Sequence, residues 1–204
     1  MTLSGASQGK GPETIAAQLS RGVDADVAIL SREGLGELIA SGQVVAGTDV
    51  DLARAALGAA VRSGARRPDI GTIEAFKRAL LSAKVVAVPA STSGIYLTAE
   101  LFPRLGIADR LHTKITARGS QSAALVAAGD ADIAVQPVSE LVCEAGLDFL
   151  GPIPAELQLV QTFSAAIVAG SKEVDASRAL LAFLASERAA AAIRKNGMLP
   201  VREG

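Results

Sequence analysis

Hydrophobic and polar positions along the chain follow two alternating patterns. Short unbroken apolar runs, typical of strands buried on both faces, alternate with stretches whose apolar residues recur three and four positions apart, as in helices that cover a sheet. This alternation predicts an α/β fold. After a short strand in residues 1–11, the main predicted strands are 26–30, 85–88, 114–117, 133–136, 147–150 and 163–168, and the predicted helices are 12–21, 31–41, 73–81, 96–102, 120–128, 174–185 and 187–196.

One arrangement of residues occurs twice. Ile15–Ile29 and Ser122–Gln136 both read as a helix end, a glycine, an Asp-Ala-Asp step and an apolar strand. The repetition predicts two similar lobes, and Val50–Arg62, which has few turn-forming residues, is read as a long strand that passes from one lobe to the other. We expect a discontinuous lobe of residues 1–56 and 163–204 and an inserted lobe of residues 57–162.

Several helix boundaries are marked by single residues. Pro12 suits the first turn of a helix, and Ser31 and Thr72 are placed to cap the helices that follow them. In the helix after Thr72, Glu74 and Arg78 have the spacing of an i,i+4 ion pair. These signals fix the expected ends of three helices.

The composition of the chain limits which folds and which binding partners are possible. Half of the residues are apolar but only 3% are aromatic, so the core must consist of Ala, Val, Leu and Ile. Such a core suits helices packed on a parallel sheet, and we expect a mixed, mostly parallel sheet in each lobe. The net charge is −1 with both signs evenly spread, so the chain has no electrostatic footprint for nucleic acid or an acidic membrane.

The residues that usually carry catalysis or bind metals are scarce. The only cysteine, Cys143, excludes an internal disulfide and is expected to be buried, and the only histidine, His112, has no cysteine or second histidine near it. No nucleophile-elbow, zinc-protease or dinucleotide motif is present. We predict no catalytic residue, no metal and no cofactor. The Asp24/Asp26 and Asp130/Asp132 pairs precede strands, so we interpret them as scaffold.

The strongest candidate site is Ser91-Thr92-Ser93-Gly94, which lies between a predicted strand end and a helix start. Small hydroxyl residues at such a place bring side-chain hydroxyls and unpaired backbone N–H groups together, and the helix dipole favours negative charge there. The loop can therefore bind an anion. The alternative is an ordinary helix cap with spare serines.

A second polar loop stands near the start of the chain, at residues 4–10. It superficially resembles a phosphate-binding loop, but Ser4 stands where that motif needs its first glycine and Gly11 where it needs Ser or Thr, so a nucleotide site is excluded. Binding of a small anion by Ser7, helped by Lys10, and a merely flexible terminus both remain open.

Three further residues follow predicted strands, where ligands bind in open α/β sheets. Gln136 and Ser139 follow the second copy of the repeat, and Arg118 follows residues 114–117 and could pair with a carboxylate bidentately. The alternatives are a polar loop that caps a short helix at Ser139 and a solvated arginine.

Several segments together resemble the periplasmic molybdate-binding-protein-like solute-binding proteins. They are GVDADVAIL, SREGLGELIASG, GTIEAFKRALLSAK, STSGIYL, LFPRLGIAD, GDADIAVQPVSEL and ALLAFLASERAAAAIRKNGMLP, and they cover nearly the whole chain. The resemblance implies the type II periplasmic binding fold. The most similar subgroup is a divergent one, which a bacterial aconitate isomerase also resembles.

The resemblance carries implications for the site, the partners and the location. It implies a small anionic ligand held by Ser7 from one lobe and by Ser91, Thr92, Ser93, Gln136 and Ser139 from the other. It also implies a periplasmic location and an ABC transporter membrane component as partner. Family members begin with a signal peptide, a first strand and a first helix, and by this resemblance we expect the sequence to start after them; a genuine start at Met1 would mean a cytoplasmic protein. A sheet edge left exposed by a missing strand would allow a dimer.

These observations lead to three hypotheses. The first is a non-enzymatic solute-binding protein that closes two lobes around an oxyanion or organic acid. The second is a cis-trans isomerase of an unsaturated polycarboxylate such as aconitate, which needs a base near the substrate carbon; no carboxylate is evident among the predicted site loops. The third is a scaffold that has lost ligand binding. We expect the binding protein rather than the enzyme.

Overall fold

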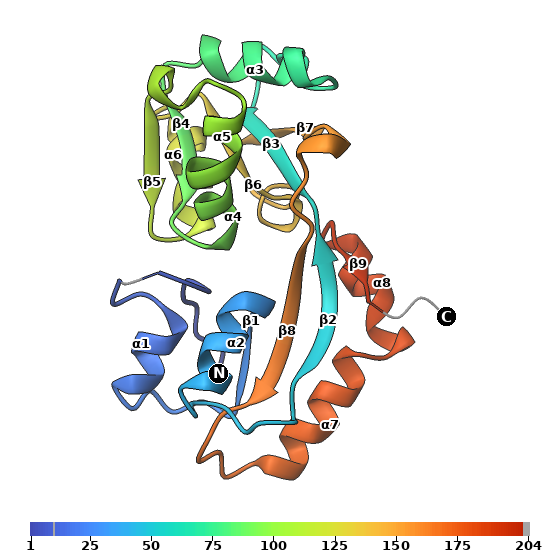
Figure 1. Cartoon of the computed structure of the whole chain (residues 1–204). Helices are drawn as coiled ribbons and strands as arrows, with labels where there is room; N and C mark the ends of the chain where they lie inside the picture. The colour runs from blue at the N-terminus through green and yellow to red at the C-terminus, as the bar shows by residue number, and fades with distance from the viewer. Residues whose placement is uncertain (10, 202–204) are drawn as a thin grey trace. The chain divides into compact units, whose positions relative to one another are not determined.

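A computed structural model describes residues 1–9 and 11–201. The chain divides into two compact units (Figure 1). Unit 1 comprises the residues up to Ala55 and those from Gln161 onward, and unit 2 is the contiguous segment Ala56–Val160. No helix in the described part of the chain has the length and hydropathy that crossing a membrane requires.

Unit 1 is built on a four-stranded sheet of order β1-β8-β2-β9. Two clusters of buried side chains form its core, one under α1 and α2 around Leu30, Leu35 and Leu38, and the other under α7 and α8 around Leu52, Ile167 and Leu181. Its elements are α1 (Ile15–Ser20), β1 (Val27–Ser31), α2 (Arg32–Ala40), β2 (Val50–Ala55), β8 (Gln161–Ile167), α7 (Val174–Leu184), α8 (Glu187–Lys195) and β9 (Leu199–Pro200).

Unit 2 is built on a five-stranded sheet of order β5-β4-β6-β3-β7. Alternate strand residues face opposite sides of the sheet: Val86 and Val88 contact the helices before and after β4, whereas Ala87 packs with Val126 of α6. The elements are β3 (Leu57–Arg62), α3 (Ile73–Ser82), β4 (Val86–Pro89), α4 (Thr92–Ile95), the π-helical segment η1 (Tyr96–Leu101), α5 (Phe102–Arg104), the 3₁₀ turn η2 (Ala108–Arg110), β5 (Thr113–Thr116), α6 (Gly119–Ala128), β6 (Ile133–Pro137), the 3₁₀ turn η3 (Val138–Glu140), β7 (Leu147–Pro152) and η4 (Ala155–Leu157).

The predicted α/β class with two helix-flanked sheets is confirmed, but the strand directions differ from the mostly parallel arrangement that we expected. Every pairing between described strands of unit 1 is antiparallel, because β8 runs opposite to both β1 and β2. In unit 2 only β4 pairs in parallel, with β5 and with β6, and β3 is antiparallel to β6 and β7. β1 is an edge strand with an exposed Ile29, and a dimer through a sheet edge stays a prediction.

Several predicted local features are confirmed. Ser31 and Thr72 cap α2 and α3, with Ser31 Oγ accepting from Gly34 N at 3.2 Å and Thr72 Oγ1 from Ala75 N at 3.1 Å. Asp132 is scaffold as expected, since its carboxylate accepts from Val85 N at 2.8 Å.

Other local predictions are wrong. Thr14, not Pro12, stands at the start of α1, because its hydroxyl caps Ala17 N. The described residues 1–9 form no strand, and Ala6 instead makes an isolated bridge with Thr14. Val50–Arg62 forms two strands in different sheets, β2 and β3, instead of one long strand. Glu74 pairs with Lys77 at 3.4 Å and not with Arg78.

Candidate functional site

The candidate site lies in unit 2, where three parallel strands end at one edge of the sheet. Pro89 at the end of β4 is level with Thr116 at the end of β5. On the other side of β4, Val86 pairs with Ile133 and Ala87 pairs with Ala134. When this register is continued by two residues, Pro89 lies level with Gln136 at the end of β6. Ligands of open α/β sheets bind at such carboxyl ends.

The segment after β4 turns tightly into α4. A β-carbon at Gly94 would overlap the carbonyl oxygen of Pro89, so only glycine lets the helix start so close to the strand end. Ser91 stands at the N-cap position but makes no side-chain capping bond. The capping alternative therefore does not explain Ser91.

Ser93 is the most informative hydroxyl of this segment. It is fully buried, and its Oγ has no hydrogen-bond partner among the described residues. Buried polar atoms in folded proteins are nearly always paired, so an orphan such as Ser93 Oγ needs a ligand, a water or another explanation. Thr92 is also buried, and a π-helical segment, a feature frequent at functional sites, begins at Tyr96.

The segment after β5 leads into the N-terminus of α6. Thr116 Oγ1 bonds the Arg118 carbonyl oxygen at 2.8 Å and Ser122 Oγ at 2.7 Å, which fixes the turn. Arg118 is the N-cap residue, and its backbone N–H donates to Gln121 Oε1 at 3.2 Å. The Nε atom of Arg118 is buried, and none of the described residues accepts a hydrogen bond from it. The backbone N–H groups of Gln121 and Ser122 donate to the Arg118 carbonyl oxygen, so the N–H groups of Gly119 and Ser120 are the ones that the first turn of α6 can offer to a ligand.

The segment after β6 brings a carboxyl group to this helix start. Gln136 is fully buried, and its side-chain N–H donates to the Glu140 carbonyl oxygen at 3.0 Å. A β-carbon at Gly119 would overlap Glu140 Oε2 and lie 3.3 Å from Gln136 Nε2. The Glu140 carboxyl group and the Gln136 amide therefore both contact the first residue of α6.

Burial raises the pKa of Glu140 to about 7, and the negative charge of Glu144 adds to the shift. Within the described part of the chain, neither Glu140 Oε2 nor Gln136 Oε1 has a hydrogen-bond partner. Both the protonated and the ionised form of this carboxyl group are therefore accessible near neutral pH, so it can either donate or accept a proton there.

Buried polar atoms without partners gather in one region of unit 2. Among the described residues there are five such atoms, Ser93 Oγ, Arg118 Nε, Gln136 Oε1, Glu140 Oε2 and Gln161 Oε1. The first four belong to segments that follow β4, β5 and β6, and we call these four residues the strand-end cluster. Only Gln161, at the start of β8, belongs to unit 1. The cluster offers donors, acceptors and one titratable carboxyl group to a small polar ligand.

Sequence reasoning named Ser93, Arg118 and Gln136 but missed Glu140. Contrary to what we expected, a carboxyl group does lie among these loops. The available signal was an acidic residue placed only three positions after the end of β6 at Pro137. Ser139 is a half-buried residue inside η3 and, in contrast to the capping alternative, caps nothing, since Pro137 is the N-cap.

Ser7 lies in unit 1, in a loop held against the start of α2. Its Oγ accepts a hydrogen bond from Ser31 N at 3.2 Å, and a β-carbon at Gly34 would overlap the Ser7 carbonyl oxygen. The Ser7 hydroxyl proton is not used by that bond. Lys10, which we considered beside Ser7, lies outside the described residues.

Cys143 lies outside the strand-end cluster. Cys143 is exposed, contrary to our expectation, because it lies in the turn region after η3 instead of in the core. No group of three or more His, Cys, Asp or Glu side chains that could hold a metal ion occurs in the described part of the chain.

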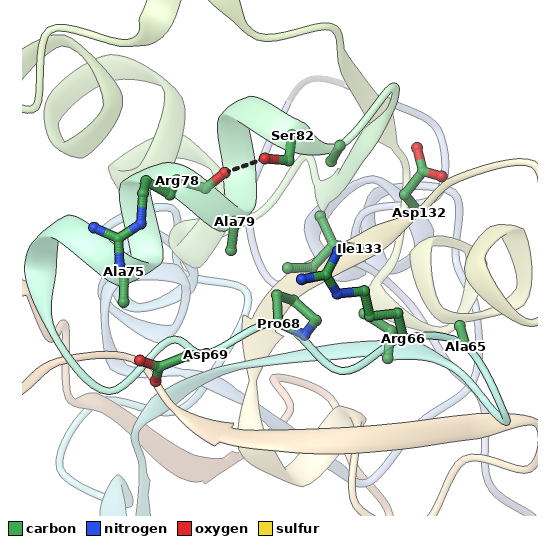
Figure 2. A pocket seen from close by; sticks show the side chains of 12 residues that line it. Ala65, Arg66, Pro68, Asp69, Ala75, Arg78, Ala79, Ser82, Asp132 and Ile133 are labelled. Atoms are coloured by element: carbon green, nitrogen blue, oxygen red, sulfur yellow. Dashed lines mark hydrogen bonds between the residues drawn. The ribbon is translucent and has the colours of Figure 1, made fainter.

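A cavity of about 610 Å³ opens at the other end of the same sheet, beside the first residue of β6, Ile133 (Figure 2). Apolar residues such as Val61, Ala79 and Ile133 line it together with Arg66 and Arg78. Both arginines are exposed, and no member of the strand-end cluster lines this cavity.

The family model for bacterial extracellular solute-binding proteins matches residues 6–199. Among curated proteins, the chain is 40% identical over 196 residues to an aconitate isomerase from a Pseudomonas species, covering 96% of this chain and 75% of that protein.

Solved structures of low sequence identity share the fold. The periplasmic molybdate-binding protein of Azotobacter vinelandii aligns with a TM-score of 0.78 at 19% identity, covering 99% of this chain and 87% of that one. The sulfate-binding protein of Mycobacterium tuberculosis aligns with a TM-score of 0.68 at 18% identity, covering 89% and 72%. Since the family model spans nearly all of the sequence, the chain belongs to the bacterial extracellular solute-binding protein family.

Proposed function

We propose that the protein binds a small anion, an organic acid or an oxyanion, at the strand-end cluster of unit 2, as the solute-binding component of an ABC-type uptake system in the periplasm. The observation that carries the proposal is the set of four buried, unpartnered polar atoms at the ends of β4, β5 and β6. Leaving such atoms unpaired costs about 1–3 kcal/mol each, and a ligand that pairs them regains this free energy.

The chemistry of the cluster supports an anion. Ser93 supplies a hydroxyl donor, Arg118 a charged N–H, and the start of α6 the backbone N–H groups of Gly119 and Ser120. The cluster also contains one amide oxygen, that of Gln136, and one carboxyl group, that of Glu140. A ligand with several oxygen acceptors and at least one group able to bond Gln136 Oε1, such as a hydroxyl or a protonated carboxyl, would satisfy all four residues.

Two structural relatives are named for the oxyanions molybdate and sulfate. The curated relative is named as an isomerase of aconitate. We therefore propose to test molybdate, sulfate, citrate, cis-aconitate and trans-aconitate by thermal unfolding. A ligand at 100 times its Kd stabilises the native state by about 2.7 kcal/mol. A rise in the melting temperature with one of the five supports binding, and a flat response to all five contradicts it.

The site residues are tested by substitution. Replacing Ser91, Thr92 and Ser93 together by alanine should abolish the ligand-induced rise while the ligand-free protein still unfolds cooperatively. Ser82→Ala, at an exposed serine of α3 in the same unit, is the matched control and should leave the rise unchanged. Ser7 stays a predicted contact of the same ligand from unit 1, and Ser7→Ala tests that prediction separately.

A second candidate function, isomerisation of aconitate, is favoured by Glu140. Aconitate carries a methylene group next to its double bond, and a base that removes a methylene proton and returns it to the far alkene carbon moves the double bond without any other reactant. Glu140 supplies a buried carboxyl group with a pKa near 7. An absorbance change on incubation with cis- or trans-aconitate supports this candidate, and no turnover at high protein concentration contradicts it.

A further inference from the structure

We propose that Glu140 is a ligand-contacting residue that binds the anion in its protonated form, so that ligand binding takes up a proton at the strand-end cluster. This inference rests on the proposed function and adds to it a residue, its chemical state and a pH dependence.

The geometry places the carboxyl group inside the cluster. Glu140 Oε2 lies against the first residue of α6, Gly119, where a β-carbon would overlap it, and Gln136 Nε2 lies within 3.3 Å of the same point. Gln136 also donates to the Glu140 backbone carbonyl at 3.0 Å, which holds the base of this side chain. An anion that reaches the N-terminus of α6 therefore meets the Glu140 carboxyl group.

No described group neutralises Glu140 when it is ionised. Its Oε2 atom is buried without a hydrogen-bond partner, and no ion pair joins it to Arg118 among the described residues. The elements packed against η3 are α6 and β3. The helix carries no charged residue of its own after Arg118, and the only charged residue of β3, Arg62, lies by Gly129 at the opposite end of α6.

Among the described residues, the one charge that shifts the pKa of Glu140 is of the same sign. Glu144 lies four residues further on and favours the neutral carboxyl group, in the same direction as burial. A nearby negative charge adds to the cost of ionising a buried carboxyl group, so both effects favour the neutral form of Glu140. A bound anion adds a second like charge, so the carboxyl group takes up a proton and becomes a donor to an oxygen of the ligand.

The proposal predicts how affinity changes with pH. Above about pH 7, where free Glu140 is ionised, each pH unit should lower the affinity up to tenfold, because a proton must be bound with the ligand. The neutral isostere Glu140→Gln retains a donor and needs no proton. Its affinity should stay within about twofold from pH 6 to pH 9.

The experiment is isothermal titration calorimetry with the anion of the five that gives the largest thermal shift, on the wild type, Glu140→Gln and Glu144→Gln. Each protein is titrated at pH 6, 7, 8 and 9, and at pH 8 in two buffers of different ionisation enthalpy. Protonation of the ligand itself affects all three proteins equally, so the difference between wild type and Glu140→Gln isolates Glu140.

The wild type should take up close to one proton at pH 8, and Glu140→Gln close to none. Glu144→Gln should keep the proton uptake, with the loss of affinity beginning at lower pH.

The outcomes separate the two proposals. If an anion binds the wild type with the same affinity from pH 6 to pH 9 and with the same enthalpy in both buffers, the proton-linked role of Glu140 is wrong and the binding function stands. If none of the five anions binds any of the proteins at any pH, the proposed function fails and this inference fails with it. The buffer comparison on the wild type needs no variant, so the proposal can still be refuted if Glu140→Gln misfolds.

Discussion

The carboxyl group of Glu140 lies directly against the α-carbon of Gly119, although the two residues are separated by most of α6 and all of β6. The contact exists because β6 and the turn η3 return the chain to the N-terminus of α6. A side chain at position 119 and a carboxyl group at position 140 cannot occupy this space together. A substitution of Gly119 therefore tests whether the contact exists.

Gly119→Ala should displace the Glu140 carboxyl group without unfolding unit 2. The overlapping atoms are the far end of a flexible side chain, so the cost in stability should stay below about 2 kcal/mol, within the usual range for overpacking. Ligand binding should fall at least tenfold, because a methyl group then occupies the cluster. Calorimetry and thermal unfolding check the two effects, and unchanged affinity would show that the ligand does not reach α6.

Glu140→Gln should stabilise the protein at pH 8. The pKa of Glu140 is raised in the folded state from 4.5 to about 7, so the neutral form is favoured by folding and stability is lost as the pH rises from about 4.5 through about 7. The difference corresponds to about 3 kcal/mol as an upper value. In urea unfolding from pH 4 to pH 9, the free energy of unfolding of the variant relative to that of the wild type should increase up to about pH 7. Above about pH 7 this difference should stay constant. Identical profiles would contradict burial of this carboxyl group.

Gly94→Ala should destabilise unit 2 by about 3 kcal/mol, at the upper end for overpacking, because the new methyl group overlaps the backbone carbonyl of Pro89, which cannot rotate away. The control is Gly36→Ala in α2, where nothing lies within 4 Å of the added carbon. That change should stabilise by about 0.5–1 kcal/mol through helix propensity. Equal effects of the two changes in denaturant unfolding would refute the close approach of α4 to β4.

The isomerase candidate predicts the opposite pH dependence at Glu140 from the binding proposal. A general base works as the carboxylate, so turnover of cis-aconitate should rise with pH to a plateau above about pH 7, and Glu140→Gln should lose activity at least a hundredfold. Rates measured by absorbance from pH 5 to pH 9 distinguish the two. Activity that survives in Glu140→Gln excludes this residue as the base.

Features that depend on neighbours in the sequence could be predicted from it. Ser31 and Thr72 were recognised as caps because a capping hydroxyl bonds an N–H only three residues away. Ser93 and Gln136 were recognised because a polar residue after a buried strand is a local signal.

Features that depend on distant segments could not be predicted. Glu140 acquires its environment from Gly119, and its raised pKa from burial that no local pattern reports. Cys143 was expected in the core from its residue type alone, but it lies in an exposed turn. The antiparallel pairing in unit 1 depends on β8, a strand more than a hundred residues after β2.

The discontinuity of unit 1 has a consequence for synthesis on the ribosome. Every strand of the unit 2 sheet lies between Leu57 and Pro152, so this unit can form its sheet as soon as that stretch has emerged. In unit 1, β8 stands between β1 and β2 and pairs with both, so the two early strands have no common partner until residue 161 has been translated. Nascent chains therefore carry the unpaired edges of β1 and β2 throughout the synthesis of unit 2, and this interval is where aggregation or chaperone capture should concentrate.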